Sequence, residues 1–438
     1  MSQITADFPI FITNPDLIYL DSAATLMKPQ IVIDWISSYL STDYANIHRW
    51  KYNISQRSEE IYRQARKNVA TFMWASDESE VIFTANSTDS TNLLVRSLIR
   101  SGSIHQDDEI IVSSLEHHAN ILCWQFLAKQ TGARLIYINI WANWVLDPKI
   151  CIDLITNKTK IIALTLCSNV TGVLRDHEIV QISTYLSASY EESSIQWSRP
   201  LLVLDASQYI VHDQLDVHKL WADFCFWTGH KLWALTGVWV LRWKKELLKQ
   251  LPSWKVWWGA IEMVSRVEVI SLWSPDKFEP WTPNIVGALS LDLAIKYVCG
   301  LGWWEIDACI HSQDIAWWYA VLNELEKHLI EYCLEQFDIY MKAWKLTLLW
   351  SQSKRRIWVF SFVLHGASIG KFSQSMQQAG VALRTGAHCA HIYHQELWET
   401  LDQCEEWCVI QTCRISLWWY TTMQDIEKFW EVMEVLCS

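Results

Sequence analysis

The 438-residue chain has little glycine, no long apolar run and no basic cluster at its start. It contains 13 Gly, whereas average usage of roughly 7% would give about 31. No stretch reaches the ~18 consecutive apolar residues of a membrane span. The first residues also lack the basic region that begins a signal peptide. We therefore expect a cytoplasmic protein that has no membrane partner.

The chain also lacks the features of a nucleic-acid-binding or disulfide-stabilised protein. Its formal net charge is −12, which disfavours nucleic acid as a partner because phosphates are negative. The 12 Cys, in a chain without an export signal, are expected to be reduced thiols. Cys404 and Cys408 lie four residues apart on an expected helix, but no second ligand pair is close in sequence. We interpret them as structural, and the sequence predicts no metal site.

What the chain has instead is tryptophan, with 29 residues. The excess of Trp matches the deficit of Gly. An indole cannot replace Gly where φ is positive or where two backbones approach closely. Our hypothesis is that many of these codons are UGA, which the source organism reads as Gly and which is written here as Trp. The alternative is a chain that is simply rich in Trp.

Apolar strands alternate with amphipathic helices along the first two thirds of the chain. This alternation predicts an α/β fold with a large, doubly wound, mostly parallel sheet. We expect an N-terminal segment at 1–25 that packs with the small domain, a large domain at 26–290, and a smaller α+β C-terminal domain at 291–438. Expected strands are 81–84, 109–112, 134–138, 161–165, 201–204 and 357–364, and expected helices include 58–72, 121–131 and 423–436. Another helix is expected to end at 217–220.

Lys231 is the first candidate for chemistry. It follows the apolar stretch Phe226-Trp227 and lies in Thr228-Gly229-His230-Lys231. An amine in this setting can hold an aldehyde cofactor as a Schiff base. Asp205 ends another apolar stretch, so its carboxylate is expected at the carboxyl edge of the sheet, where open α/β folds bind ligands.

Three segments together resemble the pyridoxal-phosphate cysteine desulfurases of the Suf (group II) type, within the class V aminotransferase family. They are Asp205-Ala206-Ser207-Gln208, Thr228-Gly229-His230-Lys231 and Arg384-Thr385-Gly386-Ala387-His388-Cys389-Ala390. The resemblance extends from the 19–24 segment to the 414–417 segment. It implies the type I fold of pyridoxal-phosphate enzymes, pyridoxal 5'-phosphate as cofactor, a homodimer, and conversion of L-cysteine to L-alanine. Sulfur would pass to an acceptor protein of the Suf system for iron-sulfur cluster assembly.

The resemblance also implies roles for individual residues around the cofactor. Asp205 would keep the pyridine nitrogen protonated, and His117 would stack on the ring and exchange protons. Gln208 and Asn169 would hydrogen-bond the ring oxygen. The phosphate would be held by Ser87, Thr88, Thr228 and His230, and by Thr282 reaching the site of the other subunit. Ser87 or Thr88 could equally be a helix N-cap.

Cys389 is the residue that distinguishes a desulfurase. Its thiolate would attack the substrate sulfur and become a persulfide, while Lys231 takes the Cα proton. Arg414, together with Arg384 and Asn169, would bind the substrate. The family commonly has a second His where this chain has Ala387, so no imidazole acts there.

The same comparison locates the proposed Gly positions. The chain has Trp where the family pattern has Gly, at Trp50, Trp74, Trp144, Trp221, Trp239, Trp243, Trp257, Trp258, Trp281 and Trp358. Trp124 is expected to be genuine, because the family also has Trp there.

Two other interpretations stay open at this point. A selenocysteine lyase or aminotransferase of the same fold would share Lys231 and Asp205, and a transaminase would not need Cys389. If the indoles at Trp257, Trp258 and Trp281 are real, the chain could instead be a non-catalytic scaffold. The sequence does not identify the sulfur acceptor or the preference between cysteine and selenocysteine.

Overall fold

The structure is a computed structural model of the chain. It describes residues 5–48, 52–140, 146–190, 199–253, 261–267, 269–272, 274–279, 282–300, 309–350, 353, 355–366, 368–400 and 411–437. Among these residues, no helix is both long and apolar enough to cross a membrane.

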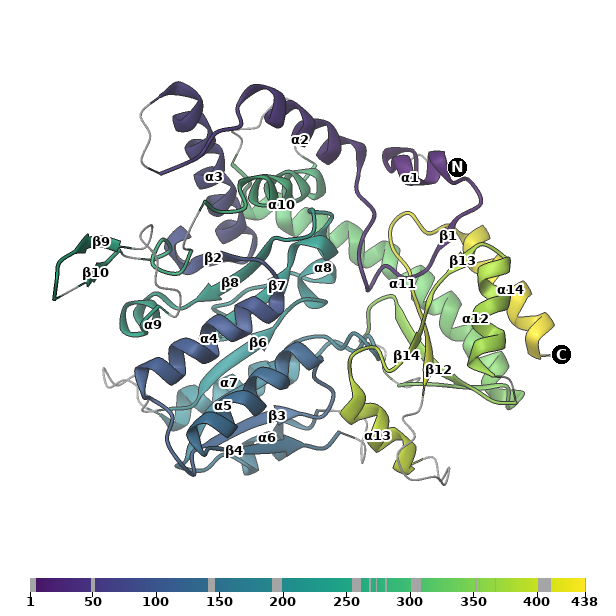
Figure 1. Ribbon diagram of the computed structural model, residues 1–438. Coiled ribbons are helices and arrows are strands. Elements are labelled where there is room, and N and C mark those ends of the chain that lie inside the picture. The colour runs from purple at the N-terminus through teal and green to yellow at the C-terminus, as the bar shows by residue number, and fades with distance from the viewer. Residues whose placement is uncertain are drawn as a thin grey trace.

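A seven-stranded sheet forms the centre of the larger part of the molecule (Figure 1). Its strands, in spatial order, are β2 (Val81–Thr84), β8 (Trp239–Trp243), β7 (Phe224–Thr228), β6 (Leu201–Asp205), β5 (Thr159–Thr165), β3 (Glu109–Ser113) and β4 (Arg134–Ile138). β8 is antiparallel to both of its neighbours, β2 and β7, and all the other pairs in the sheet are parallel. The prediction of a mostly parallel sheet is confirmed.

Both faces of this sheet are covered. Along β5, Ile161 and Ala163 belong to one apolar cluster, whereas Ile162 and Leu164 belong to another. Successive side chains of a strand point to opposite faces, so continuous apolar strands require a cover on each side. The helices α4 (Ser87–Ser101) and α5 (Leu122–Thr131) pack on one face, and α7 (Asp176–Ser189) and α11 (Ser312–Lys342) contribute to the cluster on the other.

A smaller antiparallel sheet lies beside the first. Its order is β11 (Leu346–Leu348), β12 (Val359–Leu364), β15 (Thr412–Ser416) and β14 (Arg384–Gly386), with α12 (Ile369–Gln378) and α14 (Met423–Cys437) next to it (Figure 1). The N-terminal strand β1 (Ile18–Tyr19) pairs with β13 (Val381–Ala382). The chain start therefore packs against C-terminal elements, while the domain limits at 25 and 290 stay a prediction.

The remaining elements are shorter or peripheral. They are α1 (Pro9–Thr13), α2 (Gln30–Thr42), α3 (Asn53–Phe72), α6 (Pro148–Asp153), α8 (Tyr209–His212), α9 (Lys245–Gln250), the hairpin of β9 (Ile261–Val264) and β10 (Val269–Ser271), α10 (Ile285–Val298), α13 (His391–Thr400), and the 3-10 helices η1 (Thr5–Asp7), η2 (Glu78–Glu80), η3 (His118–Asn120) and η4 (Gly229–Leu232).

The prediction of a helix that ends at 217–220 is wrong, because these residues form a turn. The Asp216 carboxylate accepts hydrogen bonds from the backbone N–H groups of His218 and Lys219. A short acidic side chain that bonds the next amides offers the backbone an alternative to a helix. Cys404 and Cys408 lie outside the described residues.

Several tryptophans have a backbone conformation that suits glycine. Nine non-glycine residues of the described chain have positive φ, and five of them are Trp74, Trp221, Trp233, Trp344 and Trp350. Left-handed backbone costs a bulky residue roughly 1–2 kcal/mol, whereas Gly adopts it freely. Two of these residues, Trp74 and Trp221, are among the predicted Gly positions. Among the remaining predicted Gly positions, Trp239, Trp243 and Trp358 have no positive φ. The other five, Trp50, Trp144, Trp257, Trp258 and Trp281, lie outside the described residues.

Candidate active site

A pocket opens at the carboxyl ends of the parallel strands. Its lining residues all follow, or end, a strand of the large sheet. They are Ser87, His117, Thr165, Cys167, Asn169, Asp205, Ser207, Gln208, Thr228 and Lys231. Loops at this edge are where open α/β sheets bind ligands. Seven of the ten were predicted from the sequence.

Lys231 lies in η4, directly after β7. A Cβ on Gly229 would come within 2.7 Å of the Val238 carbonyl oxygen, so a glycine is needed for η4 to turn this close to β8. Burial lowers the pKa of Lys231 to about 8, and the nearby Asp205 carboxylate opposes that shift. A substantial share of this amine is therefore neutral near pH 8 and can act as a nucleophile or base.

Asp205 ends β6 and is buried in the same pocket. Its Oδ1 accepts a hydrogen bond from the backbone N–H of Ser207 at 2.9 Å. Burial raises the pKa of Asp205, while the Ser207 hydrogen bonds and Lys231 act in the opposite direction. A carboxyl group whose pKa is raised by burial and lowered by a nearby cation is suited to share a proton with a ligand nitrogen.

His117 follows β3 and lines the pocket as a neutral imidazole. Burial and the nearby Lys231 lower its pKa to about 3. Its Nδ1 accepts a hydrogen bond from the backbone N–H of Ala119 at 3.1 Å. The neutral ring therefore carries its proton on Nε2.

The expected phosphate donors are only partly brought together. Ser87 lines the pocket from the first turn of α4, where free N–H groups favour anions. Thr228 also lines it, and its buried hydroxyl has no hydrogen-bond partner among the described residues. Thr88 is exposed on the same turn. The N-cap of α4 is Asn86, so neither Ser87 nor Thr88 fills that role.

Two other expected phosphate ligands lie away from the pocket lining. The Nδ1 of His230 is 3.1 Å from the Thr25 hydroxyl. The carbonyl oxygen of His230 accepts a hydrogen bond from Lys28 Nζ. Thr282 is exposed. Its expected partner is the second subunit, so its role stays a prediction.

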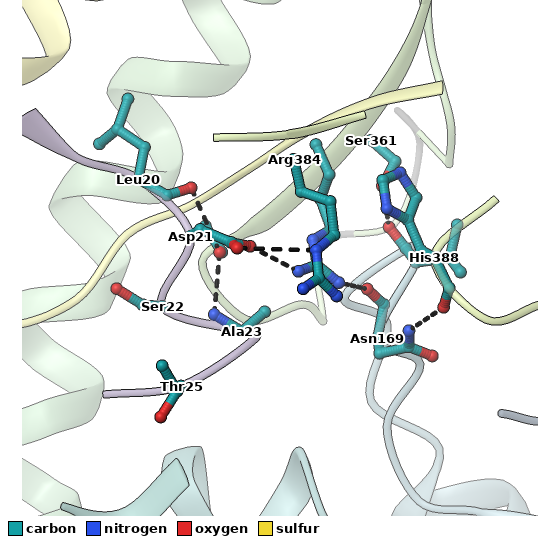
Figure 2. Close-up of polar contacts among 12 residues, drawn as sticks. Leu20, Asp21, Ser22, Ala23, Thr25, Asn169, Ser361, Arg384 and His388 are labelled. Atoms are coloured by element: carbon teal, nitrogen blue, oxygen red, sulfur yellow. Dashed lines mark hydrogen bonds and ion pairs between the residues drawn. The ribbon is translucent and has the colours of Figure 1, made fainter. Parts of the chain in front are cut away.

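The two amides expected at the ring oxygen are already engaged in holding loops. Gln208 Nε2 donates to the Ala23 carbonyl oxygen at 2.9 Å. Asn169 Nδ2 donates to the His388 carbonyl oxygen at 2.8 Å (Figure 2). Both still line the pocket, and each joins it to a segment from the chain start or from the loop before α13.

The loop that carries Cys389 lies against the pocket rim. The carbonyl oxygen of Cys389 accepts a hydrogen bond from the backbone N–H of His118 at 2.9 Å. Among the described cysteines only Cys309 and Cys389 are exposed free thiols. Both His388 and Cys389 have positive φ, a strained conformation that persists only when the surroundings fix it. Cys389 is not part of the pocket lining itself.

The two expected carboxylate-binding arginines meet at Asp21 (Figure 2). Arg414 is buried, and its Nη2 lies 2.7 Å from Asp21 Oδ1. Its Nη1 donates to the Asn169 carbonyl oxygen, and its Nε has no partner among the described residues. Arg384 Nε lies 3.6 Å from Asp21 Oδ2.

Sequence reasoning missed four residues of this arrangement. Thr165 ends β5, and Cys167 and Ser207 lie within two residues of a strand end. That position alone was a usable signal, because every strand of the parallel set ends at the same edge. Asp21 had no such signal, since its arginine partner is 393 residues away.

The pocket fits a phosphorylated aldehyde cofactor such as pyridoxal 5'-phosphate. It combines an amine of lowered pKa, a buried carboxyl group and, at Thr228, a buried hydroxyl that has no hydrogen-bond partner among the described residues. The N-terminus of α4 lies beside them. These are the groups needed to bind the aldehyde carbon, the ring nitrogen and the phosphate. No described cluster of His, Cys, Asp or Glu could hold a metal ion.

Comparison with known proteins identifies the family. The family model described as "Aminotransferase class-V" matches residues 18–429. The chain belongs to this family.

Its relatives within the class V aminotransferases extend over nearly the whole chain. A probable cysteine desulfurase of Vibrio cholerae is 33% identical over 431 residues, covering 98% of this chain and 96% of the relative. A cysteine desulfurase of Pectobacterium atrosepticum is 30% identical with the same coverage. Among solved structures, the cysteine desulfurase CsdA of Escherichia coli superposes with a TM-score of 0.80 at 27% identity, covering 99% of this chain and 98% of the other.

Proposed function

We propose that this protein is a pyridoxal-phosphate-dependent cysteine desulfurase, which converts L-cysteine to L-alanine and forms a persulfide on Cys389. One observation carries the proposal. A free, exposed thiol sits on a loop that is hydrogen-bonded to the rim of a pocket containing Lys231 and Asp205. The relatives named probable cysteine desulfurase and cysteine desulfurase support it, because their sequence similarity covers 98% of this chain.

Pyridoxal phosphate would be held by residues from four strand ends. Lys231 would bind its aldehyde carbon, Asp205 its ring nitrogen, and Ser87 and Thr228 its phosphate, while His117 would contact its ring. When bound, the cofactor supplies an electron sink for the pair released at the substrate Cα. The buried Asp205 would keep the proton on the ring nitrogen, which maintains that sink.

The protein's own groups would then carry the reaction. Arg414 and Arg384 would bind the substrate carboxylate. The Lys231 amine, freed when the substrate amino group takes its place, would take the proton from Cα. The Cys389 thiolate would attack the substrate sulfur, so an S–S bond forms as the C–S bond breaks. The electron pair of that bond stays with the substrate carbon, which takes up protons and leaves as alanine.

Variants of Cys389 and Cys309, the exposed thiols among the described cysteines, provide the test. Cys389→Ala should lower alanine formation from L-cysteine at least about 100-fold, because the variant lacks the thiol that would attack the substrate sulfur. Cys309→Ala, which removes an exposed thiol away from the pocket, should leave the rate within about twofold. Parent-like alanine formation by Cys389→Ala would overturn the desulfurase assignment. Retained transamination in that variant would point to an aminotransferase instead.

Finer features are proposed with this function. The enzyme would be a Suf-type homodimer in the cytoplasm, with Thr282 reaching the phosphate of the other subunit and a Suf acceptor taking the persulfide sulfur. Selenocysteine lyase activity is the main alternative. The relative rates with L-cysteine and L-selenocysteine would distinguish the two activities. A non-catalytic scaffold would be favoured only if no cofactor binds after Gly replaces Trp257, Trp258 and Trp281.

We also propose that Trp stands for Gly at many positions of this chain. The positive φ of Trp74, Trp221, Trp233, Trp344 and Trp350 supports the proposal, because Gly is the residue that adopts this conformation without strain.

A further inference from the structure

The side chain of His118 joins the pocket to the loop that carries Cys389. His118 opens η3, directly after His117. Its Nε2 lies 3.1 Å from the backbone nitrogen of His391 and 3.1 Å from Nδ1 of the same residue. The two imidazole rings are stacked, with centroids 4.7 Å apart and planes 25° from parallel.

This geometry fixes the protonation of His118. A backbone N–H can only donate, so Nε2 of His118 must accept and carries no proton. The neutral ring then has its proton on Nδ1. Burial and the neighbouring His391 lower the pKa of His118, which favours the same neutral form.

The accepted hydrogen bond caps helix α13. His391 is its first residue, and the first four N–H groups of a helix have no partner within the helix. The preceding residue, Ala390, has no side-chain oxygen with which to cap them. His118 therefore supplies from the large sheet what the local sequence lacks.

The backbone of His118 makes a second contact with this loop, at Cys389 itself. Its N–H donates to the Cys389 carbonyl oxygen at 2.9 Å. The chain from Cys389 to His391 is thus attached twice to one residue, at the Cys389 carbonyl oxygen and at the His391 amide. Because His388 and Cys389 both have strained positive φ, the loop needs such external contacts to keep this conformation.

We propose that His118 is a positioning residue that fixes the Cys389 loop against the pocket, with His391 as its stacking partner. The proposal rests on the proposed role of Cys389 as nucleophile. It assigns to the second His of Glu116-His117-His118-Ala119-Asn120 a task separate from that of His117.

Three substitutions at position 118 test the capping geometry. His118→Gln places an amide oxygen within reach of the position of Nε2, whereas His118→Asn is too short, and His118→Ala has no acceptor. Amide hydrogen exchange of the 386–397 segment, measured on the apoprotein, should accelerate about fivefold in the Ala and Asn variants, as loss of one hydrogen bond of about 1 kcal/mol predicts. The Gln variant should exchange at the parent rate. His105→Ala, on an exposed side chain, is the surface control.

Kinetics separate positioning from a general loss of structure. In the Ala and Asn variants, kcat for alanine formation should fall about tenfold while KM changes less than about twofold, since the substrate-binding arginines are untouched. His118→Gln should recover most of kcat. Equal values for Gln, Asn and Ala would overturn the proposal. Since hydrogen exchange needs no turnover, an inactive parent would refute the proposed function while leaving the His118 result interpretable. If Ala fails to fold, the Gln and Asn pair gives the same comparison.

Discussion

The carboxylate of Asp21 is paired with the buried guanidinium of Arg414, 2.7 Å from Oδ1 to Nη2. Arg414 also lies directly opposite Arg384 in the register of β14 and β15. Like charges facing each other on adjacent strands repel. Asp21, which also lies near Arg384, offsets that repulsion and leaves the three groups with one net positive charge. A single substrate carboxylate matches this charge.

Asp21→Asn should therefore make the arginine pair bind anions more tightly. Removing the negative charge raises the net charge of the group to two. We expect competitive inhibition by sulfate to strengthen about fivefold at low salt, and less at high salt because ions screen the site. The inhibition constant against L-cysteine is the measurement. Asp34→Asn, on the exposed side of α2, should leave it unchanged. No change in sulfate inhibition for Asp21→Asn would show that Asp21 does not set the charge of the site.

Cofactor uptake should depend on the pKa of Lys231. Only the neutral amine attacks an aldehyde, and burial lowers this pKa to about 8. The rate of combination of the apoprotein with pyridoxal should rise with pH, with a midpoint near 8, and level off above it. Pyridoxal is used because it has no phosphate, whose second ionisation at about pH 6 would otherwise alter the charge of the reagent within the profile.

The neighbouring acid gives this experiment its control. The Asp205 carboxylate raises the pKa of Lys231, so Asp205→Asn should move the midpoint to lower pH. A midpoint near the ordinary lysine value in the parent, or a shift to higher pH in the variant, would contradict the assignment of Lys231 as a buried amine coupled to Asp205.

The sequence predicted those parts of the molecule that depend on local patterns. The apolar runs before Asp205 and Lys231 indicated buried parallel strands, and the strands β6 and β7 are found there. Because parallel strands end at one edge, the same pattern was enough to bring Asp205, Lys231 and Thr228 into one pocket.

The parts that could not be predicted depend on contacts between distant segments. Arg414 and Asp21 are 393 residues apart, and His118 and His391 are 273 apart. No period or spacing links such pairs. Asp21 reaches Arg414 because it forms a bridge with Ser416 beside the small sheet. His118 reaches His391 because the loop before α13 lies against the large sheet. The prediction of a helix at 217–220 failed for the opposite reason. The local hydrogen bonds from backbone N–H groups to the Asp216 carboxylate outweighed the helical pattern.

Trp344→Gly should stabilise the protein. Trp344 has φ of 55° and an indole that is 85% exposed, so its removal relieves backbone strain at little cost in packing. We expect the free energy of unfolding to rise by about 1 kcal/mol. Trp317→Gly is the matched control, because Trp317 is also exposed but lies inside α11. Gly in a helix interior should lower stability by about 1 kcal/mol. Loss of stability in both variants would count against a glycine-like site at 344.

Peptide masses of the protein purified from its source organism decide between Gly and Trp directly. We expect Gly at the five positions with positive φ, which are 74, 221, 233, 344 and 350, because an indole is strained there. The peptide from 277 to 284 should also contain Gly in place of Trp281, although position 281 lies outside the described residues. Trp124 is the internal control, because its buried indole N–H donates to Asn120 Oδ1 at 3.0 Å and should be genuine. Trp at all of these positions would refute the decoding hypothesis. Gly at position 124 as well would mean that backbone conformation does not distinguish the two classes.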